Sequence, residues 1–170
     1  PARFLLDVFK AVKASAGKMP VMAKLNLDDF FEGSTSPAVA LPAAKALSAL
    51  GIDAIEVSGG IIASGDKSPS RLKIDSPEKE GYLLPLARLV KAEVACPVIS
   101  VGGHRSPEAI GRALEMGHAD FISLARPLIR EPGLVNRWKS GDLAPARCIS
   151  CNRCFGTLSY GEGIQCKIEL

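Results

Sequence analysis

The chain has 170 residues, 47% of them hydrophobic, and its 21 lysines and arginines against 18 aspartates and glutamates give a net charge of +3. This composition predicts one sizeable core and excludes a disordered chain. No apolar run is long enough to cross a bilayer, and the basic residues are scattered instead of forming a stripe with aromatics, so neither a membrane protein nor a nucleic-acid-binding protein is expected. The five cysteines fit reduced thiols better than a secreted disulfide framework, and we expect a cytoplasmic protein.

Helical and strand patterns alternate four times along the chain, which predicts βα units around a parallel sheet. Four such units make half of an eight-stranded barrel. Ser36 and Ser106 each precede a proline and are the predicted N-caps of the helices that follow. The predicted helices cover residues 4–17, 36–51, 77–93 and 106–117, with a short further helix ending at residue 129, and the predicted strands cover residues 20–25, 53–57, 97–101 and 120–124.

Small residues end the third and fourth predicted strands. In (β/α)8 enzymes the last two βα loops and a short extra helix commonly bind phosphate, because small residues let backbone N–H groups approach the oxygens. Gly102–Gly103, Ala125 and Arg126 therefore predict a phosphate site in which Arg126 adds a charge-assisted contact. The alternative is that Gly102–Gly103 is only a tight turn. His104 follows directly and is considered for the same site.

A lysine interrupts the first predicted strand near its C-terminal end, where the active sites of such barrels open. Lys24 stands between apolar residues, and a lysine is almost never fully buried without a partner. We expect Lys24 to contact an electron-rich edge of a cofactor. The alternative is a salt bridge to Glu56 on the next strand.

Four cysteines are spaced as Cys148-x2-Cys151-x2-Cys154-x11-Cys166 near the end of the chain. A tight triplet of thiolates with one distant cysteine is a recurrent ligand set for a [4Fe–4S] cluster. A structural zinc site is the main alternative, although zinc sites usually present two separated pairs, and unliganded thiols are the third. The fifth cysteine, Cys96, follows an apolar stretch and is expected to be a small buried hydrophobe.

Five segments share a family pattern, namely Ala23–Asn26 with Asp29, Ile55–Gly60, Ser100–Gly103, Ala125–Pro127 and Cys148–Asn152. Together they resemble the Old Yellow Enzyme family, in its NADH:flavin oxidoreductase and 2,4-dienoyl-CoA reductase branch, which includes trimethylamine dehydrogenase. The resemblance covers essentially the whole chain and corresponds to the fifth to eighth βα units of the family's barrel plus its cysteine segment. It implies that residues 1–140 form the C-terminal half of an FMN-binding TIM barrel and that residues 141–170 form an iron–sulfur segment.

The resemblance also implies an activity and its residues. The protein would be a flavin-dependent oxidoreductase that takes electrons from NAD(P)H and either reduces an activated alkene, a small molecule, or relays electrons through a [4Fe–4S] cluster. Lys24 would face the N1 and O2 edge of the flavin and stabilise negative charge on it. The phosphate would lie on Gly102, Gly103, Ala125 and Arg126, and the cluster ligands would be Cys148, Cys151, Cys154 and Cys166. The family's proton donor belongs to the first four units, so no catalytic residue is assigned.

The chain is expected to be a piece of a longer protein. Its first helix places Phe4, Leu5, Val8, Phe9 and Val12 on one face, yet it begins in mid-pattern without a methionine or an N-cap. Four parallel strands alone would expose two sheet edges and much of a barrel interior to water. We expect the missing N-terminal half of the barrel, or a second copy of the chain, to cover them. The competing functions are a zinc-stabilised assembly module without catalysis and another phosphate-binding barrel enzyme.

Overall fold

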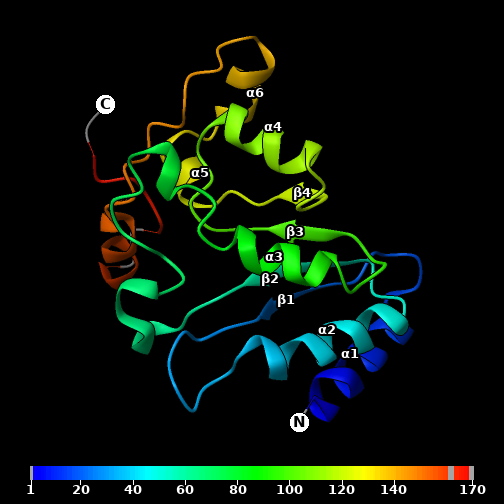
Figure 1. Cartoon of the computed structure of the whole chain (residues 1–170). Helices are drawn as coiled ribbons and strands as arrows, with labels where there is room; N and C mark the ends of the chain where they lie inside the picture. The colour runs from blue at the N-terminus through cyan, green and yellow to red at the C-terminus, as the bar shows by residue number, and fades with distance from the viewer. Residues whose placement is uncertain (1, 161–162, 169–170) are drawn as a thin grey trace.

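A four-stranded parallel sheet forms the centre of the molecule, and its strands lie in the order β1–β2–β3–β4, as they follow along the chain (Figure 1). The computed structural model describes residues 2–160 and 163–168. Helices follow every strand, so the predicted βα units and the half-barrel fold are confirmed. Within these residues, no helix is long and apolar enough to cross a bilayer. The strands are β1 (Met22–Asn26), β2 (Ala54–Ser58), β3 (Val98–Ser100) and β4 (Phe121–Ile122); the α-helices are α1 (Arg3–Ala16), α2 (Pro37–Ala49), α3 (Leu84–Lys91), α4 (Pro107–Glu115), α5 (Arg126–Arg130) and α6 (Leu134–Lys139); and the 3-10 helices are η1 (Ile62–Lys67), η2 (Pro77–Lys79) and η3 (Arg153–Tyr160).

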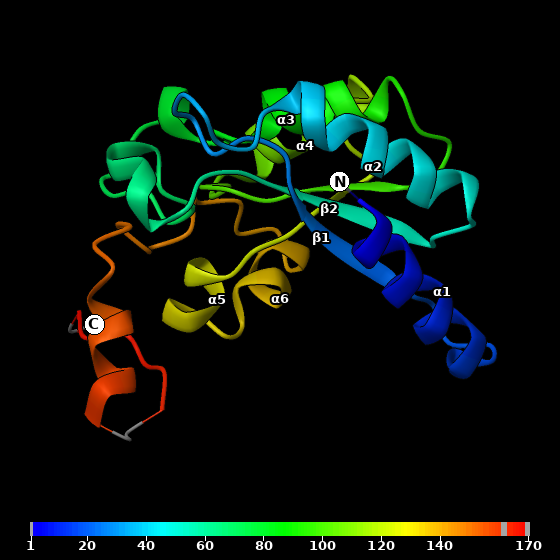
Figure 2. The ribbon, with the colours of Figure 1, turned by 90° about the horizontal axis from the view of Figure 1, so that it is seen from below.

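One face of the sheet packs against α2 and α3 and forms the core. Ile55, Val57 and Val98 on this face have no solvent exposure, and neither have Leu47 of α2 and Val90 of α3. Figure 2 shows α2, α3 and α4 along one side of the sheet and α5, α6 and the cysteine-rich segment on the other. Fully burying one such aliphatic side chain stabilises the fold by about 1.5–3 kcal/mol. This face therefore holds the sheet and its helices together.

The opposite face carries a row of two charged and two apolar side chains, one from each strand. Lys24 is in register with Glu56, Glu56 with Ile99, and Ile99 with Phe121. Register partners share a face because side chains alternate along each strand. In the part of the chain that the structure describes, β1 and β4 each pair with one strand only, and Phe121 on β4 is 57% exposed. This is the interior face of a barrel, open at both edges.

The prediction of a helix over residues 77–93 is wrong for the first half of that range. Pro77–Lys79 is a single 3-10 turn, and α3 begins only further along the chain. Gly81 adopts a left-handed conformation with φ +60°, which interrupts the helix. The N–H of Tyr82 then donates to the carbonyl of Gly102 at 3.1 Å instead of to a helical carbonyl. This hydrogen bond brings Tyr82 to the loop that follows β3.

The first helix buries only part of its apolar face. Of the five apolar side chains assigned to that face, only Phe9 is buried, whereas Phe4, Val8 and Val12 are exposed, Phe4 at 81%. The helix packs on α2 at the open edge of the sheet, so one narrow stripe suffices for contact.

Two elements towards the C-terminus also differ from expectation. β4 keeps only two of the five residues predicted as strand, although the N–H of Ser123 still donates to the carbonyl of Ser100 at 2.8 Å. The six residues of α6 were not predicted as a helix. They make fewer than two turns, which is too short for a helical period to show.

Ser36 and Ser106 are the N-cap residues of α2 and α4, as predicted, and a distant carboxylate fixes the backbone before α4. Neither Ser36 nor Ser106 bonds its helix through the side chain. The carboxylate of Glu80 accepts hydrogen bonds from the N–H groups of Arg105 (3.1 Å) and Ser106 (2.9 Å) and from the Ser106 hydroxyl (2.5 Å). Negative charge at a helix N-terminus also interacts favourably with the helix dipole. Glu80 thus fixes the start of α4 directly after the glycine pair.

Candidate functional site

A cavity of about 270 Å³ opens at the carboxyl ends of the strands. It is lined by Lys24 in β1, by Gly102–Gly103 after β3, and by Ala125 and Arg126 after β4. The structure therefore brings all five residues that the sequence assigns to cofactor binding to one place. In open and closed α/β folds alike, this end of a parallel sheet is where ligands bind.

The glycine pair is required by the packing of its own loop. Gly102 has φ +113° and Gly103 has φ +75°, conformations that favour glycine. A Cβ atom on Gly103 would lie 2.7 Å from Cε1 of Tyr82, and one on Gly102 would lie 3.0 Å from Cε2 of the same ring. Tyr82 therefore occupies the space that a side chain would need. Within the described ranges, the N–H groups of both glycines donate to no protein acceptor, so they remain for a ligand.

Arg126 is the most buried of three cationic residues that line the cavity, the others being Lys24 and Arg105. It is only 9% exposed, and its Nη1 donates to the carbonyl of Arg71 at 2.8 Å and to Oδ1 of Asn152 at 2.6 Å. Among residues 2–160 and 163–168, its Nε and Nη2 have no protein acceptor. One nitrogen thus anchors the guanidinium while the other two can bind an anion. This arrangement fits a phosphate group.

Lys24 forms the ion pair that was the alternative to a cofactor contact. Its Nζ donates to Oε1 of Glu56, its register partner on β2. The lysine side chain nevertheless remains 54% exposed and lines the cavity. The ion pair holds the ammonium at the cavity wall, so the salt bridge and a contact with a ligand are compatible.

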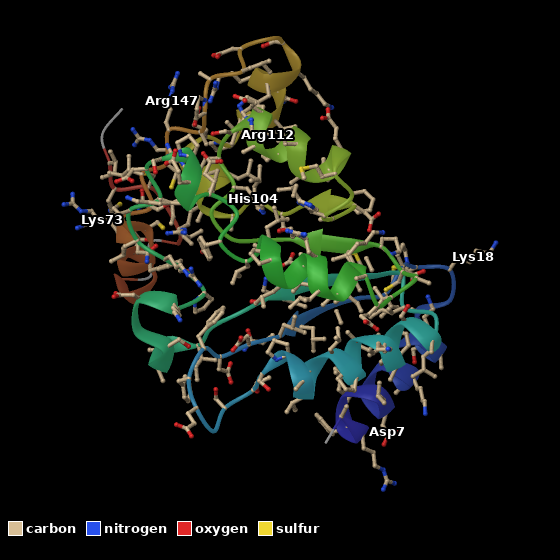
Figure 3. The ribbon with its side chains drawn as sticks, viewed as in Figure 1. Asp7, Lys18, Lys73, His104, Arg112 and Arg147 are labelled. Atoms are coloured by element: carbon tan, nitrogen blue, oxygen red, sulfur yellow. The ribbon has the colours of Figure 1, made fainter. Side chains whose placement is uncertain are left out.

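His104 lies in the wall of the cavity as a neutral group. Figure 3 shows it inside the molecule, beside the loop between β3 and α4. The ring is 3% exposed, and Nε2 lies 2.9 Å from the hydroxyl of Ser100. Burial lowers the pKa of His104 from 6.5 to about 4, against a smaller opposing effect of the Glu80 carboxylate. His104 therefore offers no positive charge to a phosphate at neutral pH.

We expect His104 to make the protein less stable in acid. Between pH 6.5 and about 4 the unfolded chain protonates this ring and the folded chain does not, so stability is lost as the pH falls through that window, by on the order of 3 kcal/mol. His104→Gln keeps a polar group for Ser100 and should flatten the dependence, measured as the free energy of unfolding in urea at pH 7 and pH 4.5. His118→Gln is the matched control and should retain the wild-type slope. Equal slopes in wild type and His104→Gln would contradict the assignment.

The four clustered cysteines line a second, smaller cavity. Cys148, Cys151, Cys154 and Cys166 all contribute to its wall, which shares Arg126 and Ile129 with the first cavity. In the part of the chain that the structure describes, no group of three or more His, Cys, Asp or Glu side chains is close enough to hold a metal ion. The thiols thus surround a common space without converging on one point.

The surroundings of this second cavity are positively charged. Its described lining includes the side chains of Arg126, Arg130, Arg147 and Lys167 and no carboxylate. Nη1 of Arg130 lies 3.4 Å from the Sγ atom of Cys166. Burial and the neighbouring Cys148 raise the pKa of the Cys154 thiol above its usual value. Four sulfur donors among cationic side chains fit a thiolate-ligated, anionic centre. Cys96, by contrast, is buried in the core as expected.

Three residues near the cavities, Arg71, Tyr82 and Phe30, had not been singled out in the sequence, and Asn152 had been part of a family segment without a role of its own. The guanidinium of Arg71 stacks on the ring of Tyr82, 4.5 Å from its centroid, and also lies 5.4 Å from that of Phe30. Asn152 bonds Arg126 as described above. Each contact joins residues far apart in the chain, and an aromatic or an asparagine by itself gives no sequence signal for it. The one available hint was the position of Asn152 between two of the spaced cysteines.

Comparison with known proteins gives several relatives and solved structures similar to this chain. The chain is 34% identical over 157 residues to an NADH oxidase of Thermoanaerobacter brockii, covering 91% of this chain and 24% of the relative. It is 31% identical over 188 residues to a 4,4'-dithiodibutanoate disulfide reductase of Rhodococcus erythropolis, covering 94% of this chain and 46% of the relative. The structure superposes on histamine dehydrogenase from Rhizobium sp. 4-9 with a TM-score of 0.80 at 25% identity, covering 96% of this chain and 23% of the other.

The chain thus spans between about a quarter and a half of the length of these relatives. A sequence model of the NADH:flavin oxidoreductase / NADH oxidase family matches residues 1–143, which include both strand-end loops of the first cavity. Solved structures of old yellow enzyme homologues share the fold as well, one with a TM-score of 0.59 at 26% identity. The chain belongs to the NADH:flavin oxidoreductase / NADH oxidase family, the Old Yellow Enzyme family that its motifs resemble.

Proposed function

We propose that this chain supplies the cofactor-phosphate site and an electron-relay segment of an FMN-dependent NAD(P)H oxidoreductase. The observation that carries the proposal is that Lys24, Gly102–Gly103, Ala125 and Arg126, from the ends of three strands, line one cavity. FMN, when bound, supplies the chemistry of accepting a hydride from a nicotinamide and passing electrons on. Membership of the family supports both the flavin and the nicotinamide donor.

The phosphate end of the cofactor is assigned to Arg126 and the neighbouring backbone. Nη1 is held by Arg71 and Asn152, which leaves Nε and Nη2 to donate to phosphate oxygens. Hydrogen bonds between a guanidinium and a phosphate are about twice as strong as neutral ones. The N–H groups of Gly102 and Gly103 lie in the same cavity wall without protein acceptors within the described residues. Burial of Arg126 limits the water that competes for these donors.

Lys24 is assigned to the flavin ring. Its ammonium stays at the cavity wall because Glu56 holds it there. A fixed positive charge at the N1 and O2 edge of the ring would stabilise the negative charge that the ring gains on reduction. Lys24 would therefore raise the reduction potential of the cofactor and not take part in proton transfer.

The four spaced cysteines are proposed as the ligands of a [4Fe–4S] cluster. Their spacing, their common cavity and the cationic lining support this assignment. The two cavities share Arg126 and Ile129, which supports a short path for electrons between the two redox centres. A zinc ion held by the same thiols is the alternative, and it would make the segment structural.

The open edges of the sheet are proposed to be covered by the other half of a barrel. Met22 on β1 and Phe121 on β4 are 61% and 57% exposed, at opposite ends of the sheet. Relatives that are two to four times longer support the presence of additional chain for this purpose. The small-molecule substrate, an activated alkene or another electron acceptor, would bind between the two halves. A second copy of this chain is the alternative partner.

Cofactor analysis of the full-length protein, purified anaerobically, tests the proposal. We expect FMN to be released on heating, an absorption band near about 450 nm with a broad iron–sulfur shoulder, and about four iron and four sulfide per chain. A colourless protein with stoichiometric zinc would favour the assembly module. Phosphate bound at Arg126 in a protein without flavin would favour a different phosphate-binding barrel enzyme.

A further inference from the structure

Asn152 lies in the cysteine-rich segment, between Cys151 and Cys154, and lines the second cavity, yet its side chain bonds Arg126, which lines the first cavity as well. Its Oδ1 accepts from Nη1 of Arg126 at 2.6 Å, and its Nδ2 donates to the carbonyl of Ser70 at 2.7 Å. These are opposite ends of one amide group. Asn152 therefore ties the guanidinium of Arg126 to the loop that follows β2.

The same loop holds Arg126 directly. The carbonyl of Arg71, next to Ser70, accepts from Nη1 of Arg126 at 2.8 Å. The backbone adds a further bond between loop and cysteine segment, from the N–H of Lys73 to the carbonyl of Ser150 at 3.2 Å. With Nη1 bonded on both sides, the guanidinium has one orientation, and its other two nitrogens are left for a ligand.

The backbone at this position favours asparagine for a physical reason. Asn152 has φ +58°, a left-handed conformation that asparagine tolerates better than other residues with a side chain, glycine apart. Glycine would adopt the backbone conformation but would leave Arg126 and Ser70 without the amide. Asparagine both adopts this φ angle and supplies the amide. Replacing it with glycine therefore removes the side-chain hydrogen bonds while keeping the backbone conformation.

We propose that Asn152 is a positioning residue for the phosphate contact of Arg126, an inference that rests on the function proposed above. Asn152 does not touch the cofactor. It holds Arg126 in the orientation in which Nε and Nη2 can donate to the phosphate. Less side-chain entropy is then lost on binding, and this preorganisation strengthens binding. The cysteine-rich segment thereby contributes to flavin binding independently of any metal that it carries.

Comparison of FMN with riboflavin tests this role, because riboflavin lacks the phosphate. The preference for FMN is the dissociation constant for riboflavin divided by that for FMN, both measured on the full-length apoprotein. Asn152→Gly should lower this ratio by about tenfold, which is the scale of one charge-assisted hydrogen bond. The dissociation constant for riboflavin should stay within about twofold of wild type. Flavin fluorescence quenching measures both constants, and iron content shows whether the cysteine segment is intact. Asn136→Ala, at an exposed asparagine of α6, is the control and should leave the ratio unchanged.

A double-mutant cycle shows whether Asn152 acts through Arg126. In an Arg126→Ala background, Asn152→Gly should lower the FMN preference no further. Equal weakening of FMN and riboflavin by Asn152→Gly, or an unchanged ratio, would overturn the positioning role, as would a full effect in the Arg126→Ala background. A wild-type protein that binds flavin without preferring FMN would overturn the proposed function, and this inference with it.

Discussion

Cys154→Ser is expected to abolish the proposed iron–sulfur cluster. The thiol is buried in the wall of the second cavity with the other three cysteines. A serine hydroxyl is a poor ligand for iron in such a centre, and a cluster held by four cysteines has no spare donor among them. We expect iron and acid-labile sulfide to fall from about four per chain to below about one. Colorimetric iron and sulfide analysis and the visible spectrum measure the change.

Cys96→Ser is the matched control for that experiment. Cys96 is buried to nearly the same extent, 8% exposed against 9%, but it lies in the core between α3 and β3. Its replacement should cost stability, about 1–3 kcal/mol for a buried hydroxyl, and leave the iron content unchanged. If Cys154→Ser retained full iron and sulfide, the assignment of this thiol would be wrong. If the wild-type protein contained stoichiometric zinc and no iron, the four cysteines would be ligands of a zinc ion and not of a cluster.

Gly103→Ala is expected to cost both stability and cofactor binding. The new Cβ would lie 2.7 Å from the ring of Tyr82, whose hydroxyl donates to the carbonyl of Pro69 at 2.8 Å. For a residue with a Cβ, the left-handed φ of +75° lowers the free energy of unfolding by about 1–2 kcal/mol. Displacement of the Tyr82 ring lowers the free energy of unfolding by roughly a further 1–3 kcal/mol. The loop must move, and FMN affinity should fall by more than about tenfold because the backbone donors move with it.

Gly111→Ala gives the control for this prediction. Gly111 lies inside α4, and a Cβ there would meet no atom within 4 Å. Alanine is favoured over glycine in a helix interior by about 1 kcal/mol, so this variant should be slightly more stable and bind FMN as the wild type does. Urea unfolding and FMN titration measure both effects. An unchanged FMN affinity in Gly103→Ala would argue against phosphate binding at this loop.

At the glycine pair, the structure shows the tight turn, and the proposed phosphate site is compatible with it. The sequence suggested either a tight turn or a phosphate loop at Gly102–Gly103. The structure shows that the positive φ angles and the packed ring of Tyr82 require glycine, while the N–H groups stay without protein acceptors among the described residues. Lys24 gives a similar result, since its ion pair with Glu56 and its place in the cavity wall occur together.

The repeated periodicity of the sequence determined the βα units, the order of the parallel strands and the gathering of their carboxyl-terminal loops. Since parallel strands end at the same edge of a sheet, Lys24 near the C-terminal end of β1 was expected to meet the residues after β3 and β4 there, and the structure places all five predicted residues in that cavity. The spacing of the cysteines likewise predicted a shared site, and the four thiols line one cavity.

Only the tertiary structure decided how these groups are held. The start of α4 is held by Glu80, 26 residues before the serine that it bonds, and Asn152 bonds Ser70 across 82 residues. The neutral state of His104 follows from burial, and burial depends on every element packed around the ring. A local pattern reports only neighbours within a few residues along the chain. Contacts between distant segments depend on the relative positions of whole loops, and these exist only once the chain has folded.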